Sequence, residues 1–350
     1  MVGLLQLFSW ILQGGLLLLA FFVPLVLLLA AFPPFLRYLA RIGHVSDDAH
    51  KSPPTKVPEP AGPLLFIAIL AGELTVAAGY GSYVPLALVA GAGIAFAIGL
   101  ADDLYVLGGK TKPLLLLLAG VGFVSFVFVR PEIYTSDLSF PLLGDTSPHF
   151  IIFTVLAIVA FPVVTNAFNM MDAFNGEISW FTLLTSLALL AGVVLHEVYR
   201  GGFSMSRVAS VLPLVAVATG FLVYNRYPAR AFDGDSGSLM FGAMFAGIAI
   251  TGGVEVAAMI AMVPAILNSF YTLSSVRGFV ERRKMSSRPT FIGSDGLLHA
   301  SVEKDAPNTL VRLVLLASPL TEKDLVKSIV KLVAVACAFS VGISVLTWVL

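Results

Sequence analysis

Ten apolar runs, each long enough to cross a lipid bilayer as a helix, dominate this sequence. A helix needs about 20 apolar residues to span the hydrocarbon core of a membrane. The chain has 58% hydrophobic and only 12% charged residues, which is too little polar surface for a water-soluble globule of 350 residues. We therefore expect an all-α polytopic membrane protein, a single transmembrane domain over residues 1–350. The runs lie near residues 8–32, 62–80, 83–101, 113–130, 149–166, 178–197, 208–224, 237–252, 254–275 and 326–350.

The distribution of basic residues predicts the orientation of these spans. One set of loops holds nearly all the loop lysines and arginines, whereas the other set holds only Arg130, Arg200 and Arg207. Cytosolic loops carry the excess of Lys and Arg, so we expect the first set in the cytosol and both termini outside. Most unusual polar clusters also lie in that set, which places the expected active site at the cytosolic face. The predicted cytosolic loops are residues 33–62, 101–112, 166–177, 225–238 and 276–325.

The last predicted cytosolic loop, residues 276–325, carries structure of its own. Residues 290–302 alternate apolar and polar side chains around a Gly-Ser-Asp-Gly turn, which predicts a small hairpin. Residues 310–316 are too short to span, and we expect them to lie in the membrane interface or to pack as an ordinary core segment. Thr321 and Asp324 are typical of a capping box that opens the final helix.

Paired carboxylates end the third apolar run. Asp102 and Asp103 repel each other and oppose the dipole at the end of a helix, so a compensating cation is expected nearby. Lys110 and Lys112 lie one loop away and could pair with these acids or bind a phosphate. A solvated turn after a span is the alternative interpretation.

A regular series of three amides and one carboxylate, which we call the amide series, lies at the end of the fifth run. Asn166, Asn169, Asp172 and Asn175 recur every three residues, so on a helical turn they face roughly one way. Such groups at the end of an apolar span are costly unless they line a polar cavity. Their oxygens suit Mg²⁺, which takes few protein ligands. Helix capping is the alternative, although four residues in register exceed what one cap needs.

Three further segments are polar and predicted to be cytosolic. Residues 232–238 read FDGDSGS, in which Gly234 permits close backbone approach and Asp235 lies where a helix N-terminus can hold an anion. A flexible turn is the alternative there. Residues 47–62 combine charges with prolines and could be an ordinary connection. The basic run at 282–288 could be a contact with anionic lipids.

Taken in order, these segments resemble the polyprenyl-phosphate N-acetylhexosamine-1-phosphate transferase family, which is glycosyltransferase family 4-like. The resemblance is closest to the dolichyl-phosphate branch of archaea and eukaryotes. Each motif alone is weak, but five in sequence order form a strong match over nearly the whole chain. The motifs are PEPAG at 58–62, ADD at 101–103 with Lys112, TNAFNMMDAFNG at 165–176, FDGDSGS at 232–238 and NTLVRLVLLASPLTEKDL at 308–325.

The resemblance implies a set of site residues. Asn169 and Asp235 would hold Mg²⁺, for which Mn²⁺ is an acceptable substitute. The implied catalytic residues are Asp102, Asp103, Lys112 and Asp235. The implied substrate-binding residues are Glu59, Asn166, Asp172, Asn175, Gly234 and Arg288.

Two positions depart from the family pattern. A histidine- and arginine-rich motif is common in the last cytosolic loop of the family, whereas this chain offers only Arg288 and Pro289 near that place. This leaves sugar recognition the least defined part of the site. Asn175 stands where the bacterial branch has a second aspartate.

The implied reaction transfers N-acetylglucosamine-1-phosphate, or a related N-acetylhexosamine-1-phosphate, from a UDP-sugar to dolichyl or polyprenyl phosphate and releases UMP. It would be the first step of lipid-linked glycan assembly for N-glycosylation. The alternatives are a bacterial-type undecaprenyl-phosphate transferase of cell-wall synthesis and a secondary transporter. The expected partners are the two substrates and the bilayer, with a homodimer left open and no nucleic acid. The expected location is the archaeal plasma membrane or the endoplasmic reticulum membrane.

Overall fold

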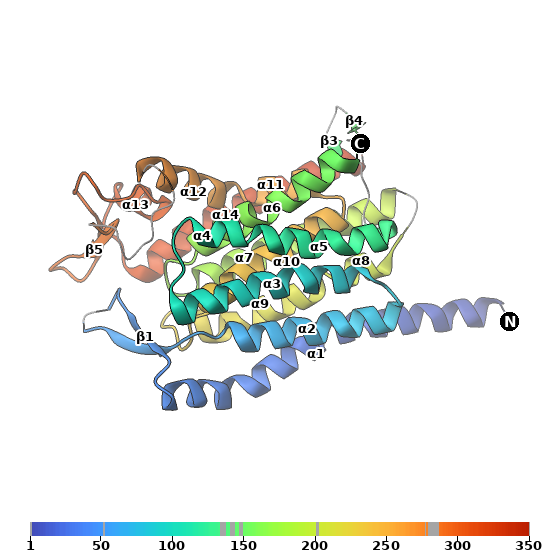
Figure 1. Cartoon of the computed structure of the whole chain (residues 1–350), viewed down its shortest axis with the longest axis horizontal. Coiled ribbons are helices and arrows are strands. Elements are labelled where there is room, and N and C mark those ends of the chain that lie inside the picture. Colours follow the sequence, from blue (N-terminus) through green and yellow to red (C-terminus); the bar gives the residue numbers. More distant parts are fainter. Residues whose placement is uncertain are drawn as a thin grey trace.

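Long helices lying side by side make up most of the computed structural model, which describes residues 2–349 except 52, 134–137, 141–143, 147–149, 201–202, 277 and 279–286 (Figure 1). The uninterrupted long helices are α1 (Val2–Arg41), α2 (Gly62–Tyr80), α3 (Val84–Tyr105), α6 (Phe150–Met170), α7 (Glu177–Tyr199), α10 (Gly234–Thr251) and α14 (Glu322–Trp348). Three further rods are broken once: α4 (Thr111–Leu115) with α5 (Leu117–Val129), α8 (Met205–Ala209) with α9 (Leu212–Asn225), and α11 (Glu255–Ala261) with α12 (Val263–Ser275).

The apolar runs of the sequence become these helices. Within the described residues, eight helical segments are long and apolar enough to cross a membrane, and the α11–α12 pair, bent by 64°, makes a ninth if it counts as one span. The polytopic all-α fold expected from the sequence is therefore confirmed. The remaining predicted run, 237–252, is α10. Its first turn is polar, and all its residues except Asp235 are buried.

Helix α10 lies at the centre of the bundle because small residues let its neighbours approach closely. It packs against α3, α6, α2 and α7. At Gly99 of α3, a Cβ atom would collide with the carbonyl oxygen of Asp235. At Gly242 of α10 itself, a Cβ atom would come within 2.6 Å of the Thr165 Cα atom in α6. These contacts bring the start of α10 against the end of α3.

The chain connections divide between the two ends of the bundle. In Figure 1, α1 begins and α14 ends at the right, whereas β1 (Val45–Asp48), β5 (Thr290–Ile292) and α13 (Leu310–Leu315) lie at the left. The loops predicted to be cytosolic thus gather at one end, opposite both termini. Which side of a membrane this end faces stays a prediction.

Two short hairpins stand at that end. Strand β1 pairs in an antiparallel manner with β2 (Thr55–Pro58). Strand β5 pairs with β6 (Leu298–Ala300), which confirms the hairpin predicted in the last loop. A third pair, β3 (Leu138–Phe140) with β4 (Gly144–Thr146), lies at the opposite end.

The short helix α13 packs onto this end of the protein. Val311 and Leu315 are buried and belong to the main apolar core, whereas Leu316 is 65% exposed. The inner face of α13 therefore packs as an ordinary core segment, which was the alternative to a location in the membrane interface. The predicted cap of α14 is also confirmed, since Thr321 Oγ1 accepts a hydrogen bond from the Asp324 backbone N–H at 3.2 Å.

Candidate active site

A pocket of about 960 Å³ opens at the end of the bundle that carries β1 and β5. It lies where the end of α3, the start of α4, the end of α6 and the start of α10 meet. All the site residues named from the sequence line it, namely Glu59, Asp102, Asp103, Lys112, Asn166, Asn169, Asp172, Asn175, Gly234, Asp235 and Arg288. Segments more than 200 residues apart in the chain therefore converge as the sequence motifs predict.

Lys112 is the cation that the paired carboxylates require. Its Nζ atom lies 2.7 Å from Asp102 Oδ2 and 2.7 Å from Asp235 Oδ2, so one ammonium joins the ends of α3 and α10. The Lys112 side chain is only 16% exposed, and the other Asp102 oxygen accepts a hydrogen bond from the Leu107 backbone. Charges held in so little water interact more strongly than at a surface. The sequence left two lysines open, and the structure assigns the pairing to Lys112.

Asp103 has a different task from its neighbour. Its Oδ1 atom accepts a hydrogen bond from the Asp235 backbone N–H at 2.7 Å, and its Oδ2 atom accepts one from the Ser236 N–H at 3.0 Å. The first N–H groups of a helix have no partner within the helix, and a carboxylate there also complements the helix dipole. Asp103 of α3 therefore caps α10. The anion at this helix N-terminus is a side chain of the protein itself.

Gly234 makes this cap sterically possible. Its backbone φ angle is +72°, a conformation that residues with a Cβ atom rarely adopt. A Cβ atom there would also come within 2.7 Å of Asp103 Oδ2. The close backbone approach that the sequence predicted at Gly234 is thus made to a carboxylate of α3.

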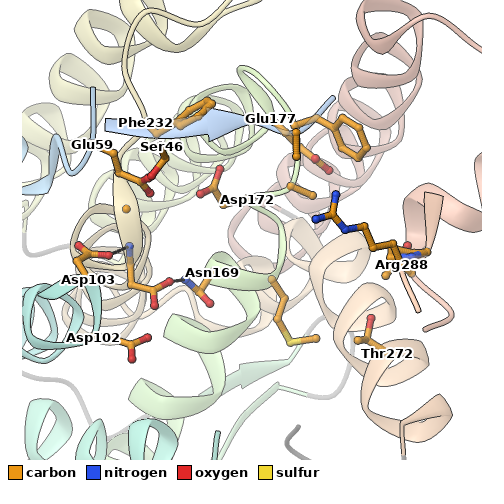
Figure 2. A pocket seen from close by; sticks show the side chains of 18 of the residues that line it. Ser46, Glu59, Asp102, Asp103, Asn169, Asp172, Glu177, Phe232, Thr272 and Arg288 are labelled. Atoms are coloured by element: carbon orange, nitrogen blue, oxygen red, sulfur yellow. Dashed lines mark hydrogen bonds between the residues drawn. The ribbon is translucent and has the colours of Figure 1, made fainter. Parts of the chain in front are cut away.

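Asn169 and Asp235 form the pair expected to hold a metal ion. Asn169 Nδ2 donates a hydrogen bond to Asp235 Oδ1 and another, of 2.9 Å, to Ser238 Oγ. Asn169, labelled in Figure 2, lies in the last turn of α6, and Asp235 lies in the first turn of α10. Among the described residues there is no group of three or more His, Cys, Asp and Glu that could hold a metal ion. One carboxylate beside one amide suits Mg²⁺, which completes its shell with water and phosphate oxygens.

The amide series does not form a single helical stripe. Helix α6 ends at Met170, so Asn166 and Asn169 lie in its last turns, whereas Asp172 and Asn175 lie in the connection to α7. Asn166 Nδ2 donates to the Pro162 carbonyl at 2.7 Å. Asn175 is buried, and its Nδ2 atom donates to Asp48 Oδ2 at 2.9 Å. Its predicted contact with substrate stays a prediction.

The remaining predicted residues surround the same cavity. In Figure 2, Glu59 and Asp172 lie on one side, and the guanidinium of Arg288 reaches in from the other. Thr272 of α12 lies below Arg288 in the same view. Arg288 thus brings positive charge to a pocket that is otherwise rich in carboxylates.

Several lining residues were not predicted as site residues. Phe232 and Glu177 line the pocket, as do residues 43–50. In the sequence, the only indication that Phe232 and Glu177 belong to the site was their position at the margins of the recognised motifs. Asp233 is fully buried, and neither carboxylate oxygen has a hydrogen-bond partner within the described part of the chain. Burial, together with the charge of Asp172, raises the pKa of Asp233 well above its ordinary value.

The bundle and its terminal pocket define a multi-pass integral membrane protein with a polar site at one end. Residues 85–253 match the model of glycosyl transferase family 4, so the chain is similar to that family over this range. The matched range contains nine of the eleven site residues predicted from the sequence, whereas Glu59 and Arg288 lie outside it.

Three relatives illustrate the similarity. A Bacillus subtilis protein named as a probable undecaprenyl-phosphate N-acetylglucosaminyl 1-phosphate transferase is 29% identical over 64% of this chain and 59% of its own length. A Sulfolobus acidocaldarius protein is provisionally named UDP-N-acetylglucosamine–dolichyl-phosphate N-acetylglucosaminephosphotransferase. It is 25% identical over 62% of this chain and 61% of its own length. A phospho-N-acetylmuramoyl-pentapeptide-transferase of Thermoanaerobacter is 28% identical over 71% of this chain and 77% of its own length. The match thus spans about three fifths of the first two relatives.

Proposed function

We propose that this protein transfers a sugar-1-phosphate from a UDP-sugar to a polyprenyl phosphate. An oxygen of the lipid phosphate attacks the β-phosphorus of the UDP-sugar. The bond from that phosphorus to the oxygen bridging the two phosphates breaks, and UMP leaves with the bridging oxygen. The observation that carries this proposal is the junction of Lys112, Asp102, Asp235 and Asn169 in one pocket at the end of a membrane bundle.

Lys112 is the main electrostatic group of the proposed site. A transferring phosphoryl group gathers negative charge on its oxygens, and a fixed cation in a site poor in water stabilises that charge. The two carboxylates that hold Lys112 Nζ at 2.7 Å fix its position before substrate arrives. Its partners therefore serve to orient the ammonium.

Mg²⁺ would be held by Asp235 and Asn169, whose adjacent carboxylate and amide fit the oxygen ligands this ion prefers. When bound, the ion supplies neutralising charge for a diphosphate. The substrate phosphates would complete its shell, because the protein offers few ligands at this place.

Direct attack by the lipid phosphate fits the site better than a covalent enzyme intermediate. A phosphate monoester is already mostly ionised near pH 7, so it needs little help from a base. Both oxygens of Asp102 and both oxygens of Asp103 are engaged by protein donors. These two carboxylates therefore act as positioning groups in the proposed mechanism.

For the finer specificity we propose N-acetylglucosamine as the sugar and dolichyl phosphate as the lipid. Support comes from the segment at 308–325 and from the provisional name of the Sulfolobus relative. A bacterial-type reaction with undecaprenyl phosphate is the second candidate, favoured by the names of the Bacillus and Thermoanaerobacter relatives. A transporter would keep its polar groups near the membrane midplane, whereas this pocket lies at one end of the bundle.

The decisive assay measures UMP release by the purified protein with Mg²⁺, a panel of UDP-sugars, and either dolichyl or undecaprenyl phosphate. We expect UMP only when lipid phosphate is present, and we expect Asp235→Asn to lose at least about a hundredfold in turnover. Movement of intact UDP-sugar across liposomes without UMP formation would refute the transferase. Labelled protein after incubation with β-phosphate-labelled UDP-sugar alone would refute direct attack.

A further inference from the structure

One wall of the pocket is a single stretch of chain from the first predicted cytosolic loop. All residues from 43 to 50, which we call the wall segment, line the cavity. Part of the segment is β1, which pairs with β2 from Val45 opposite Pro58 to Asp48 opposite Thr55. In Figure 2, Ser46 of this segment lies beside Glu59 and Phe232. The hairpin alone is too small to be stable by itself, so its position depends on what anchors it.

The wall segment is anchored by four side chains from three distant parts of the chain. We call Asp48, Lys51, Asn175 and Glu322 the anchoring cluster. Lys51 Nζ forms an ion pair with Glu322 of the first turn of α14, and a second, of 3.3 Å, with Asp48 Oδ2. Asn175 donates from Nδ2 to Asp48 at 2.9 Å and from its backbone N–H to Glu322 Oε1 at 3.2 Å.

Two ring contacts extend this anchorage. Lys51 Nζ lies 4.1 Å from the centre of the Tyr227 ring, a cation–π contact. The His50 ring stacks on Phe174 with 4.1 Å between ring centres. The connection between α6 and α7 and the connection between α9 and α10 therefore both contact this end of the hairpin.

The charged side chains of the anchoring cluster are largely shielded from solvent. The side chains are 17% exposed at Lys51, 5% at Glu322 and 3% at Asp48. Burial lowers the pKa of Lys51, but its hydrogen bond to Glu322 and the charges of Glu322 and Asp48 outweigh that effect and leave the pKa raised. Lys51 is therefore a cation, and removing it leaves two buried carboxylates uncompensated.

Ser46 of the wall segment lies on the other side of the pocket from Asp102 (Figure 2). An apolar groove of about 500 Å³ runs between α3 and α5, and Leu107 lines both this groove and the pocket. Ala101 of the groove directly precedes Asp102. An acceptor lipid would thus reach the site beside Asp102. Glu59 and Phe232 lie with Ser46 on the side away from Asp102, so the nucleotide part of a UDP-sugar would lie on that side (Figure 2).

We propose that Lys51 and Glu322 are positioning residues that hold the wall segment against the nucleotide part of a UDP-sugar. The inference rests on the proposed function for the identity of the ligand. Neither residue is among the partners of Lys112 or Asp235, where the reacting phosphates would lie under the proposed function. Loss of the ion pair therefore weakens nucleotide binding more than it slows the transfer.

The test uses the full-length protein with Lys51→Met and Glu322→Gln. The glutamine keeps an oxygen acceptor for the Asn175 N–H but loses the charge. We expect the KM for UDP-sugar to rise about tenfold in either variant, because a displaced binding wall is costly even far from the chemistry. We expect kcat and the KM for lipid phosphate to stay within about twofold, since the Lys112 centre is untouched.

The matched control lies on the same hairpin. Lys56 pairs with Asp47 at 3.9 Å, but both side chains are more than 60% exposed, at 72% and 63%. An exposed pair of this kind contributes little, so Lys56→Met should behave as wild type. Lys51→Arg keeps the charge and should restore most of the affinity for UDP-sugar.

A readout without turnover separates this proposal from the proposed function. Hydrogen exchange over residues 43–58 should be faster in Lys51→Met than in Lys56→Met, since exchange reports local opening. If wild type releases no UMP, the transferase fails, while faster exchange still supports the anchor. Unchanged exchange, or a fall in kcat with the KM for UDP-sugar unaltered, would overturn the positioning role.

Discussion

Two adjacent aspartates in this pocket do different work because of helix geometry. Successive residues of an α-helix point about 100° apart, given 3.6 residues per turn. Asp102 therefore faces Lys112, whereas Asp103 faces the start of α10. The pattern ADD indicates a site but cannot assign these roles, since the assignment depends on where α4 and α10 lie. Lys112 likewise differs from Lys110 only through its place on α4.

Asp233 permits a prediction at the scale of one residue. Burial raises its pKa, so the folded protein favours the protonated form. At a pH below the pKa of this carboxyl in the unfolded chain, both states are protonated and the group costs no stability. As pH rises above that value, the unfolded chain ionises first, so the folded state becomes less stable relative to it. Asp233→Asn removes this effect with nearly the same shape. We expect the variant to have a higher melting temperature than wild type, and the gap to widen from pH 5 to pH 8.

Thermal unfolding in detergent at several pH values measures this difference. A gap of the same size at every pH would show that Asp233 does not titrate differently in the folded state. Conversely, a variant that melts lower than wild type at pH 8 would indicate that the carboxylate has a stabilising partner.

At the scale of elements, the sequence predicts a helix boundary best where the residues at that boundary form a local pattern, such as a cap. Residues 62–80 form α2 as predicted, and Thr321 caps α14. Helix α1 extends to Arg41, well beyond the predicted run at 8–32. The prediction followed apolar residues only, whereas a helix can continue through polar residues at its end. Only the folded chain shows that Asn175 contacts Asp48 and Glu322. Those partners are 127 and 147 residues away, and no local pattern encodes them.

The junction of α3 with α10 gives a prediction at this scale. Asp103→Ala leaves the backbone N–H groups of Asp235 and Ser236 without their partner. Loss of a helix cap costs about 1 kcal/mol, and here it also frees Asp235 to shift relative to Lys112. We expect a lower melting temperature and at least about a tenfold loss of UMP release, since displaced catalytic groups are costly.

Asp103→Asn is the matched comparison for this cap. Its amide oxygen can accept one of the two hydrogen bonds, so its losses should lie between those of wild type and Asp103→Ala. Wild-type turnover in Asp103→Ala would mean that α10 is held in place by its packing alone.

For the whole molecule, the arrangement of loops gives a topological prediction. Strand β5 and helix α13 of the last predicted cytosolic loop lie at the opposite end of the bundle from the β3–β4 pair. Basic residues favour the cytosol for the first of these ends. In a Cys337→Ala background, Thr146→Cys should react with an impermeant maleimide from outside intact cells. Val302→Cys, at a position 91% exposed, should react only after the membrane is opened.

Labelling of both positions from one side would contradict the arrangement of the spans, and exchanged sides would reverse the orientation. Hydropathy reports each run separately, and nine of the ten predicted runs correspond to helical segments that could span a membrane within the described residues, if the bent α11–α12 pair counts as one span. The place of α10 within the bundle was less predictable, because its polar first turn and its glycine contacts are meaningful only once its neighbours are present.

The cap on α10 also bears on biosynthesis. A ribosome delivers α3 long before α10, so the carboxylate of Asp103 emerges more than 100 residues ahead of the N–H groups it will bind. Until α10 is inserted, Lys112 has no Asp235 to contact, and Asn169 lacks the same partner. Under the proposed function, a nascent chain is therefore inert toward nucleotide sugars through most of its translation. The Lys112 centre is complete only once α10 has joined α3, α4 and α6, and the anchoring cluster is complete only once α14 supplies Glu322.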